Sequence, residues 1–169
     1  MLIDNLNKEE LKNLLVKNWM SHDGSWFLNT FLRVGIKEAN KINKGAIKML
    51  ASLEIARIKR LSEFNDKQIN NYQELTDFMK TTYSVLKGDF MDFTISFLGK
   101  NRFHWEMGKC FAFEGMKRLG IENEYECGVI YRVSCWLNEL GIKHKIVPKI
   151  KHCLLNSQNQ CSGDIIVEF

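Results

Sequence analysis

The spacing of hydrophobic residues divides the chain into a helical first half and a second half that mixes strands with helices. In the first half, apolar side chains recur every three or four positions, as on one face of a helix. Asn7, with Glu10 three residues later, has the pattern of a helix N-cap. The predicted helices cover about residues 8–20, 21–35, 37–62 and 66–86. In the third of these helices, seven apolar residues lie near one face: Ile42, Ala46, Met49, Leu50, Leu53, Ala56 and Ile58.

After Lys87 and Gly88 the hydrophobic period changes to two, which is typical of a half-buried strand. Residues 91–97 alternate in this way, and a turn at residues 99–101 leads into residues 102–107, so we expect a β-hairpin. Two helices that end at glycines and three further strands complete the prediction. The helices cover about residues 110–119 and 127–140, and the strands about 142–147, 150–156 and 164–169.

These elements predict an α+β fold, in which helices pack on an antiparallel sheet and a helical extension precedes them. The chain has no internal repeat and no low-complexity linker. We therefore expect a single domain over residues 1–169, with a helical part at residues 1–87 and an α+β part at residues 88–169 that contains the cysteine cluster.

Composition narrows the class of protein. Of the 169 residues, 45% are hydrophobic and 26% are charged, as in ordinary globular proteins. No apolar run approaches the roughly 18 to 20 residues that span a bilayer, and the N-terminus lacks the order of a signal peptide. The net charge of +4 is spread along the chain, unlike the basic patches of nucleic-acid-binding proteins. We expect a cytoplasmic protein without a membrane or nucleic-acid partner, and the sequence leaves open whether it forms a homodimer.

Four of the five cysteines lie at the ends of predicted elements or on the last predicted hairpin. Cys110 and Cys127 each begin a helix, Cys153 lies in the penultimate strand, and Cys161 follows the last turn. Thiolates in such places can converge on a tetrahedral metal such as zinc. Because the chain has no C-x-x-C motif, the spacing alone favours metal ligands and buried free thiols equally. Cys135 lies in the middle of a helix, where we expect a core residue.

Aromatic residues supply the candidates for a ligand pocket. Trp26, Phe27 and Phe31 form a stripe that is either a core seam or the wall of an apolar pocket. His104 and Trp105 alternate on the predicted hairpin, and we place them in the same candidate pocket. The sequence lacks a glycine-rich phosphate loop, an H-E-x-x-H motif and a G-x-S-x-G elbow. A Cys–His nucleophile pair stays open, because such partners meet in space and not in sequence.

The C-terminal sequence "YECGVIYRVSCWLNELGIKHKIVPKIKHCLLNSQNQCSGDIIVEF", with "GKCFAFEGMKRLG" ahead of it, resembles the four-vinyl reductase type of domain. That family is regarded as binding hydrocarbon-like molecules, and it includes stand-alone archaeal proteins. The same stretch resembles the sensor domains of phenol- and xylene-responsive regulators. The resemblance covers roughly residues 88–169, and the N-terminal helices are similar to the family only loosely.

In those sensors a zinc ion is held by a cysteine before a helix and by two cysteines around a turn. The matching positions are Cys127, Cys153 and Cys161, at separations of 26 and 8 residues. The resemblance therefore implies that these three thiolates bind zinc.

The fourth ligand departs from the family pattern. The sensors use a glutamate three residues before the middle cysteine, and here that position is Ile150, whose side chain cannot ligate a metal. We assign the fourth position to Cys110, which opens the preceding helix, with Glu126 and His152 as alternatives. The ion could also be iron, since four thiolates can hold an iron–sulfur cluster.

The resemblance implies a protein that binds an apolar small molecule and contains a structural zinc site. We expect a binding protein rather than an enzyme, because a closed thiolate shell leaves no position for a reactive water. The alternative is a small hydrolase, because the overall layout also resembles the family that acts on aminothiazoline carboxylate. In that case a cysteine or histidine would lie at an open pocket.

Overall fold

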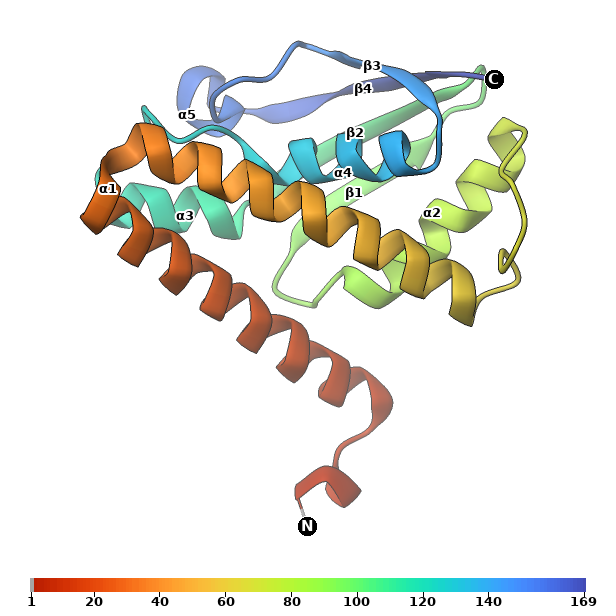
Figure 1. Ribbon diagram of the computed structural model, residues 1–169, viewed down its shortest axis with the longest axis horizontal. Coiled ribbons are helices and arrows are strands. Elements are labelled where there is room, and N and C mark those ends of the chain that lie inside the picture. The colour runs from red at the N-terminus through yellow and green to blue at the C-terminus, as the bar shows by residue number, and fades with distance from the viewer. Residues whose placement is uncertain (1) are drawn as a thin grey trace.

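The computed structural model describes residues 2–169, and Figure 1 shows helices packed across one face of a four-stranded sheet. The α+β fold expected from the sequence is confirmed. The helices are η1 (Leu2–Asn5, a 3-10 helix), α1 (Lys8–Leu61), α2 (Tyr72–Leu86), α3 (Phe111–Arg118), α4 (Gly128–Glu139) and α5 (Leu154–Gln158). The strands are β1 (Asp92–Phe97), β2 (Arg102–Lys109), β3 (Lys143–Val147) and β4 (Cys161–Glu168).

The sheet has the strand order β1-β2-β4-β3, and every neighbouring pair is antiparallel. The predicted hairpin of β1 and β2 is present, and Lys100 and Asn101 adopt the positive φ that its tight turn requires. Side chains along β1 and β3 alternate between more and less exposed positions, as expected for a sheet with one covered face. The helices cover that face (Figure 1).

The first helix begins where the sequence predicts. The Asn7 side chain accepts hydrogen bonds from the backbone N–H groups of Glu9 and Glu10, at 3.0 and 2.9 Å. The Glu10 carboxylate in turn accepts from the Asn7 N–H at 2.8 Å. This reciprocal capping box satisfies donors that the first turn of a helix leaves unpaired.

The three helices predicted between residues 8 and 62 form two helical arms joined at Gly35, whose φ of 77° and ψ of 168° are not helical. Glycine adopts this conformation without strain because it has no Cβ. We call residues 8–34 the first arm and residues 36–61 the second arm. In Figure 1 the first arm diverges from the second and ends far from the sheet. It still contacts the body, since the Asp89 N–H donates to Asn13 Oδ1 at 3.0 Å.

The main core lies between the second arm, α2, α4 and the sheet. Its largest fully buried hydrophobic side chains are Phe78, Phe103, Leu75, Met79, Leu137 and Val167. A second, smaller cluster joins α1 to α3 and the loop that follows it, and contains Phe27, Ala39, Met116, Ile121 and Tyr125. The main core therefore packs the helices against the sheet, while the second cluster packs the first arm against α3 and the loop after it.

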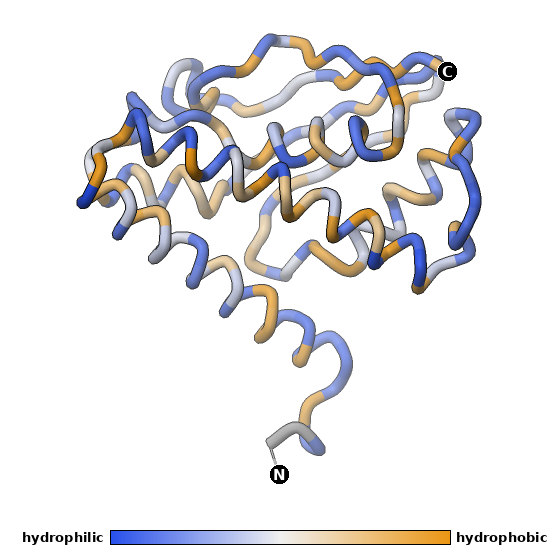
Figure 2. The backbone as a smooth tube through the Cα atoms, viewed as in Figure 1, coloured by the Kyte–Doolittle hydropathy of each residue, from blue (hydrophilic) through white to orange (hydrophobic). Residues whose placement is uncertain are grey.

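The second arm of α1 has two apolar faces, and only one of them is buried. Ala51 and Ile55 are 0% and 5% exposed in the main core. The apolar face that the sequence predicted points mostly toward solvent. On it, the exposed fractions of Ile42, Met49 and Leu53 are 47%, 74% and 50%. Figure 2 shows that hydrophobic residues recur along both arms. Even so, no helix among residues 2–169 has the length and apolar character needed to cross a bilayer.

The predicted strand at residues 150–156 is wrong. His152 makes an isolated bridge to Glu126, and the next residues form the short helix α5. β4 begins at Cys161, three residues before the predicted start, and pairs on its two sides with β2 and β3. Because both edges of β4 are occupied, the predicted terminal hairpin has no free edge on which to form.

Candidate metal centre

The four cysteines expected to bind a metal all lie at element ends. Cys110 follows β2 and is the N-cap of α3, and Cys127 is the N-cap of α4. Cys153 is the N-cap of α5 rather than a strand residue, and Cys161 is the first residue of β4. No side-chain capping hydrogen bond is formed by any of the three N-cap cysteines.

Backbone contacts bring these four element ends together. The Cys127 N–H donates to the Lys151 carbonyl at 3.1 Å, which joins the start of α4 to the segment that leads into Cys153. Cys161 pairs with Met107 near the end of β2, close to where the chain turns into α3. The four thiols therefore come from four elements but lie in one region of the molecule.

The thiols lie close enough to influence one another's pKa. Burial raises the pKa of Cys110 to about 11, and the nearby Cys153 and Cys161 thiols add to the rise against the opposing backbone amides of α3. Burial raises the pKa of Cys127 to about 12, with further contributions from Cys110 and Cys161. Without a cation, each of these two thiols is held in its neutral form, because a buried thiolate has nothing to balance its charge.

A buried polar atom beside this cluster has no hydrogen-bond partner. The Trp105 side chain is 4% exposed, and its indole Nε1–H has no acceptor. The indole lies next to the Cys161 thiol, where it favours the thiolate and opposes the effect of burial on the pKa. A buried donor left without an acceptor costs roughly 1–3 kcal/mol. A thiolate at Cys161 would give this donor its acceptor.

The donor set suits a thiophilic metal, but the side chains are not yet in coordination positions. Among residues 2–169, no three His, Cys, Asp or Glu side chains are placed to hold a metal ion. Binding would therefore require the thiols to shift toward a common centre. The four-cysteine ligand set stays a prediction.

The two alternative fourth ligands, Glu126 and His152, lie in surroundings less suited to binding the metal. Glu126 forms an ion pair with Lys44, whose hydrogen bond lowers the pKa of that carboxyl group. His152 is exposed to solvent, and Ile150 packs against the main core. Cys135 is buried within α4, where burial raises the pKa of its thiol against the opposing hydrogen bond from Tyr131. These positions leave Cys110 as the strongest fourth candidate.

The five residues assigned to a ligand pocket do not share one cavity. Trp26 is 62% exposed, whereas Phe27 and Phe31 belong to the second cluster. Trp105 lies in the main core, and His104 points to the opposite face of β2. There the Nδ1 atom of His104 lies 2.8 Å from an Asp164 carboxylate oxygen. The periodic pattern found these aromatics, but alternation along a strand separates His104 from Trp105.

A buried ionic cluster between the second arm of α1 and α4 was not expected from sequence. Both carboxylate oxygens of Glu54 accept hydrogen bonds from the Arg132 guanidinium, and the Trp136 Nε1–H donates to one of them at 2.8 Å. The guanidinium also lies over the rings of Trp19 and Trp136, 4.6 and 5.1 Å from their centroids. The one available signal was Glu54 itself, a charge within the apolar face that contains Ala51.

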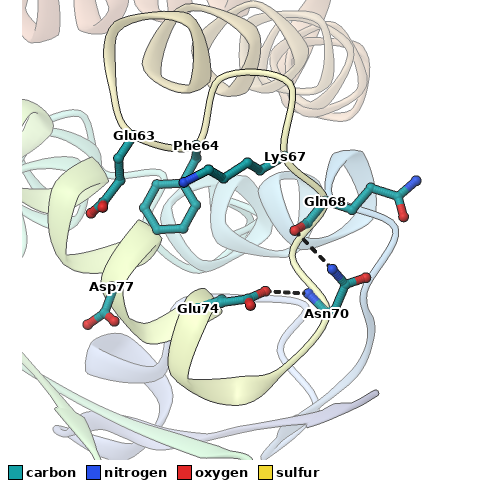
Figure 3. Close-up of a pocket in the computed structure, with 7 residues that line it drawn as sticks. All are labelled: Glu63, Phe64, Lys67, Gln68, Asn70, Glu74 and Asp77. Carbon is teal, nitrogen blue, oxygen red and sulfur yellow. Dashed lines mark hydrogen bonds between the residues drawn. The ribbon is translucent and has the colours of Figure 1, made fainter.

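Two hollows of about 410 Å³ lie on the surface, and neither contains the predicted pocket. Figure 3 shows the first, whose lining is mostly polar: Glu63, Phe64, Lys67, Gln68, Asn70, Glu74 and Asp77. In Figure 3, hydrogen bonds from Asn70 to Glu74 and Gln68 tie the loop before α2 to that helix. The second hollow borders Cys127 and contains Ser134 and His144, which sequence analysis did not single out together.

Comparison with known families gives one match. The model of a family of unknown function, DUF6125, matches residues 4–160. The chain belongs to the DUF6125 family. No curated protein and no solved structure matches the chain.

The DUF6125 match extends over both arms of α1 and most of the α+β part, so the helical and the sheet-containing halves belong to one family unit. It includes Cys110, Cys127 and Cys153 and ends one residue before Cys161. The family carries no assigned activity, so the function must be argued from the side chains of this DUF6125 member.

Proposed function

We propose that this DUF6125 protein binds an apolar small molecule and is stabilised by a zinc ion held by Cys110, Cys127, Cys153 and Cys161. The observation that carries the proposal is the gathering of four thiols from four separate elements into one region. A metal bound there would tie the starts of α3, α4 and α5 to the start of β4. We further propose that the protein is cytoplasmic, where thiols stay reduced.

Zinc suits a set of four thiolates better than a hard cation such as magnesium does, because soft sulfur ligands favour soft or borderline metals. Four protein ligands close the shell, so the role proposed for the ion is structural. Such sites contribute on the order of 10 kcal/mol in small peptides, comparable to the stability of a whole domain. The ion would also supply the positive charge that buried thiolates need.

We propose that the apolar ligand binds at the second cluster, between the first arm and α3. Phe27 packs edge-to-face against Tyr125 with a centroid distance of 5.5 Å, and Phe31 packs beside them. Tyr125 is also close enough to Cys127 to be influenced by its charge, so the cluster and the thiols adjoin. Because this cluster is separate from the main core, a ligand could enter it by a shift of the first arm alone.

Metal content tests the first half of the proposal. Protein purified under reducing conditions is expected to contain about one zinc per chain, measured by elemental analysis. Cys153→Ser and Cys161→Ser should each release the metal, whereas Cys135→Ala is the matched control and should retain it. Metal-free protein with five freely reacting native thiols contradicts the proposal, and a brown protein would identify an iron–sulfur cluster instead.

Thermal shift tests the second half. Phenols and isoprenoids that bind only the folded state should stabilise it by RT ln(1 + [L]/Kd), about 2.7 kcal/mol at a hundredfold excess over Kd. Phe31→Ala should reduce this shift, whereas Leu32→Ala, at an exposed neighbouring position, should leave it unchanged. Absence of any shift across the panel, or an equal loss in both variants, contradicts binding at the second cluster.

A further inference from the structure

We propose that Ser134 and His144 form a nucleophile–base pair that hydrolyses small carboxylic esters carrying a negative charge. This activity goes beyond the binding function proposed above and does not depend on the metal. It rests on the geometry of the two side chains and on the hollow that they line.

The hydrogen bonds of His144 fix its tautomer. Its Nδ1 lies 3.1 Å from the Ile142 carbonyl oxygen, which can only accept, so Nδ1 carries the proton. The neutral ring then presents an unprotonated Nε2, which lies 2.7 Å from Ser134 Oγ. The hydroxyl of Ser134 therefore donates to Nε2. This is the arrangement in which a histidine can remove the proton of an attacking serine.

Ser134 differs from most hydroxyl residues on the helices of this chain. Six of them donate to the carbonyl four residues earlier, which is the usual arrangement inside a helix: Ser21, Ser25, Thr30, Thr81, Thr82 and Ser157. Ser134 lies in the middle of α4, yet its hydroxyl is directed across to β3. The local backbone thus does not dictate its orientation, and the contact with His144 does.

The hollow around the pair has the chemistry of a site for an anionic substrate. It has a volume of about 410 Å³, and both Ser134 and His144 line it. Lys145 and Lys149 line the hollow and contribute positive charge. Three isoleucines supply an apolar wall for an acyl chain: Ile130, Ile146 and Ile150.

The proposed reaction needs only water as a second reactant. Ser134 Oγ attacks the ester carbonyl carbon while His144 Nε2 takes the hydroxyl proton. The bond from carbonyl carbon to leaving oxygen then breaks, and His144 returns the proton to the departing alcohol. Water, deprotonated by His144 Nε2, attacks the carbonyl carbon of the resulting acyl-serine. The Oγ–acyl bond then breaks, His144 returns the proton to Oγ, and the acid is released with Ser134 restored. A positioned base of this kind contributes about 10²–10⁴-fold to the rate.

Covalent labelling with a fluorophosphonate probe tests the pair directly, because this reagent modifies activated serines. Peptide mapping of the labelled full-length chain should place the adduct on Ser134. His144→Gln is expected to slow labelling by at least about 100-fold, in line with the loss of a general base. Ser157→Ala, which removes a helix hydroxyl with the usual backbone contact, is the matched control and should label at the original rate.

Ester hydrolysis supplies the second readout. The p-nitrophenyl ester of succinic acid, which is anionic, should be cleaved with a higher kcat/KM than neutral p-nitrophenyl acetate. Replacing Lys145 and Lys149 together by alanine should remove most of that preference.

Absence of labelling, an adduct on another residue, or Ser134→Ala protein that labels as before overturns the proposal. If Ser134→Ala fails to fold, the mapped adduct of the unmodified protein still decides the question, because the probe stays bonded to the serine that attacked it. Neither readout measures metal content, so this proposal and the zinc proposal can fail separately.

Discussion

Replacing Arg132 by methionine would leave the Glu54 carboxylate buried without its charge partner. Glu54 is 6% exposed, and it accepts hydrogen bonds from Arg132 Nε at 3.0 Å and from the second guanidinium nitrogen Nη2. The substitution removes both bonds and the positive charge, while methionine fills part of the same volume between the Trp19 and Trp136 rings. The carboxylate would keep only the Trp136 N–H as a donor.

Breaking a buried pair in this way typically costs about 3–5 kcal/mol, because the remaining charge is uncompensated. In a domain of this size each kcal/mol lowers the melting temperature by about 2–4 °C, so the expected fall is roughly 6–20 °C. Arg57→Met removes an arginine at an exposed position of α1, so it is the matched control and should change the stability by no more than about 0.5 kcal/mol.

Urea denaturation followed by circular dichroism measures these differences, and tryptophan fluorescence should give the same transition if unfolding is two-state. Combining Arg132→Met with Glu54→Leu removes both charges and leaves only the Trp136 N–H unpaired, at about 1–3 kcal/mol. The double variant should therefore be more stable than Arg132→Met alone. A single variant within about 1 kcal/mol of the unmodified protein, or a double variant that loses the sum of both single losses, would refute this account.

Two further predictions concern packing and pH. Gly163→Ala should destabilise the sheet by about 1–3 kcal/mol in urea, because a Cβ would lie 2.4 Å from the Val147 carbonyl oxygen and from the Trp105 ring; unchanged stability would contradict this. Burial raises the pKa of Tyr83, with Arg132 opposing. Since the unfolded phenol ionises more readily, stability should fall as the pH rises above about 10. Tyr83→Phe should lessen that fall in alkaline denaturation curves, and identical curves would show that Tyr83 is not responsible.

Local sequence signals predicted most element ends correctly. The Asn7 capping box and the glycine-containing turn between β1 and β2 depend on neighbours within four residues, so their chemistry is visible in the sequence. The placement of Cys110 and Cys127 before helices was also correct for the same reason. Signals of this kind locate the start of an element without reference to the rest of the fold.

Local signals of this kind did not predict the contacts between segments that are distant in the sequence. Glu54 and Arg132 lie 78 residues apart, and only the packing of α1 against α4 shows that they pair. The helical period of the second arm was recognised, but Met49 and Leu53 on the predicted face are exposed because another apolar face meets the core. We predicted a strand at residues 150–156, yet the sheet has no free edge beside β4 to accept them.

Three features of the chain meet on α4, at different positions around its axis. Cys127 is its N-cap residue, Arg132 and Trp136 face Glu54 on the second arm, and Ser134 faces His144 on β3. Because Arg132 and Trp136 are four residues apart they share one face, and Ser134, midway between them, points to the opposite one. Each contact fixes a different degree of freedom: the end of the helix, its rotation against α1 and its distance from β3. A metal at Cys127 would therefore stabilise the helix that carries the ionic cluster and the Ser134–His144 pair, while leaving the geometry of both to their own contacts.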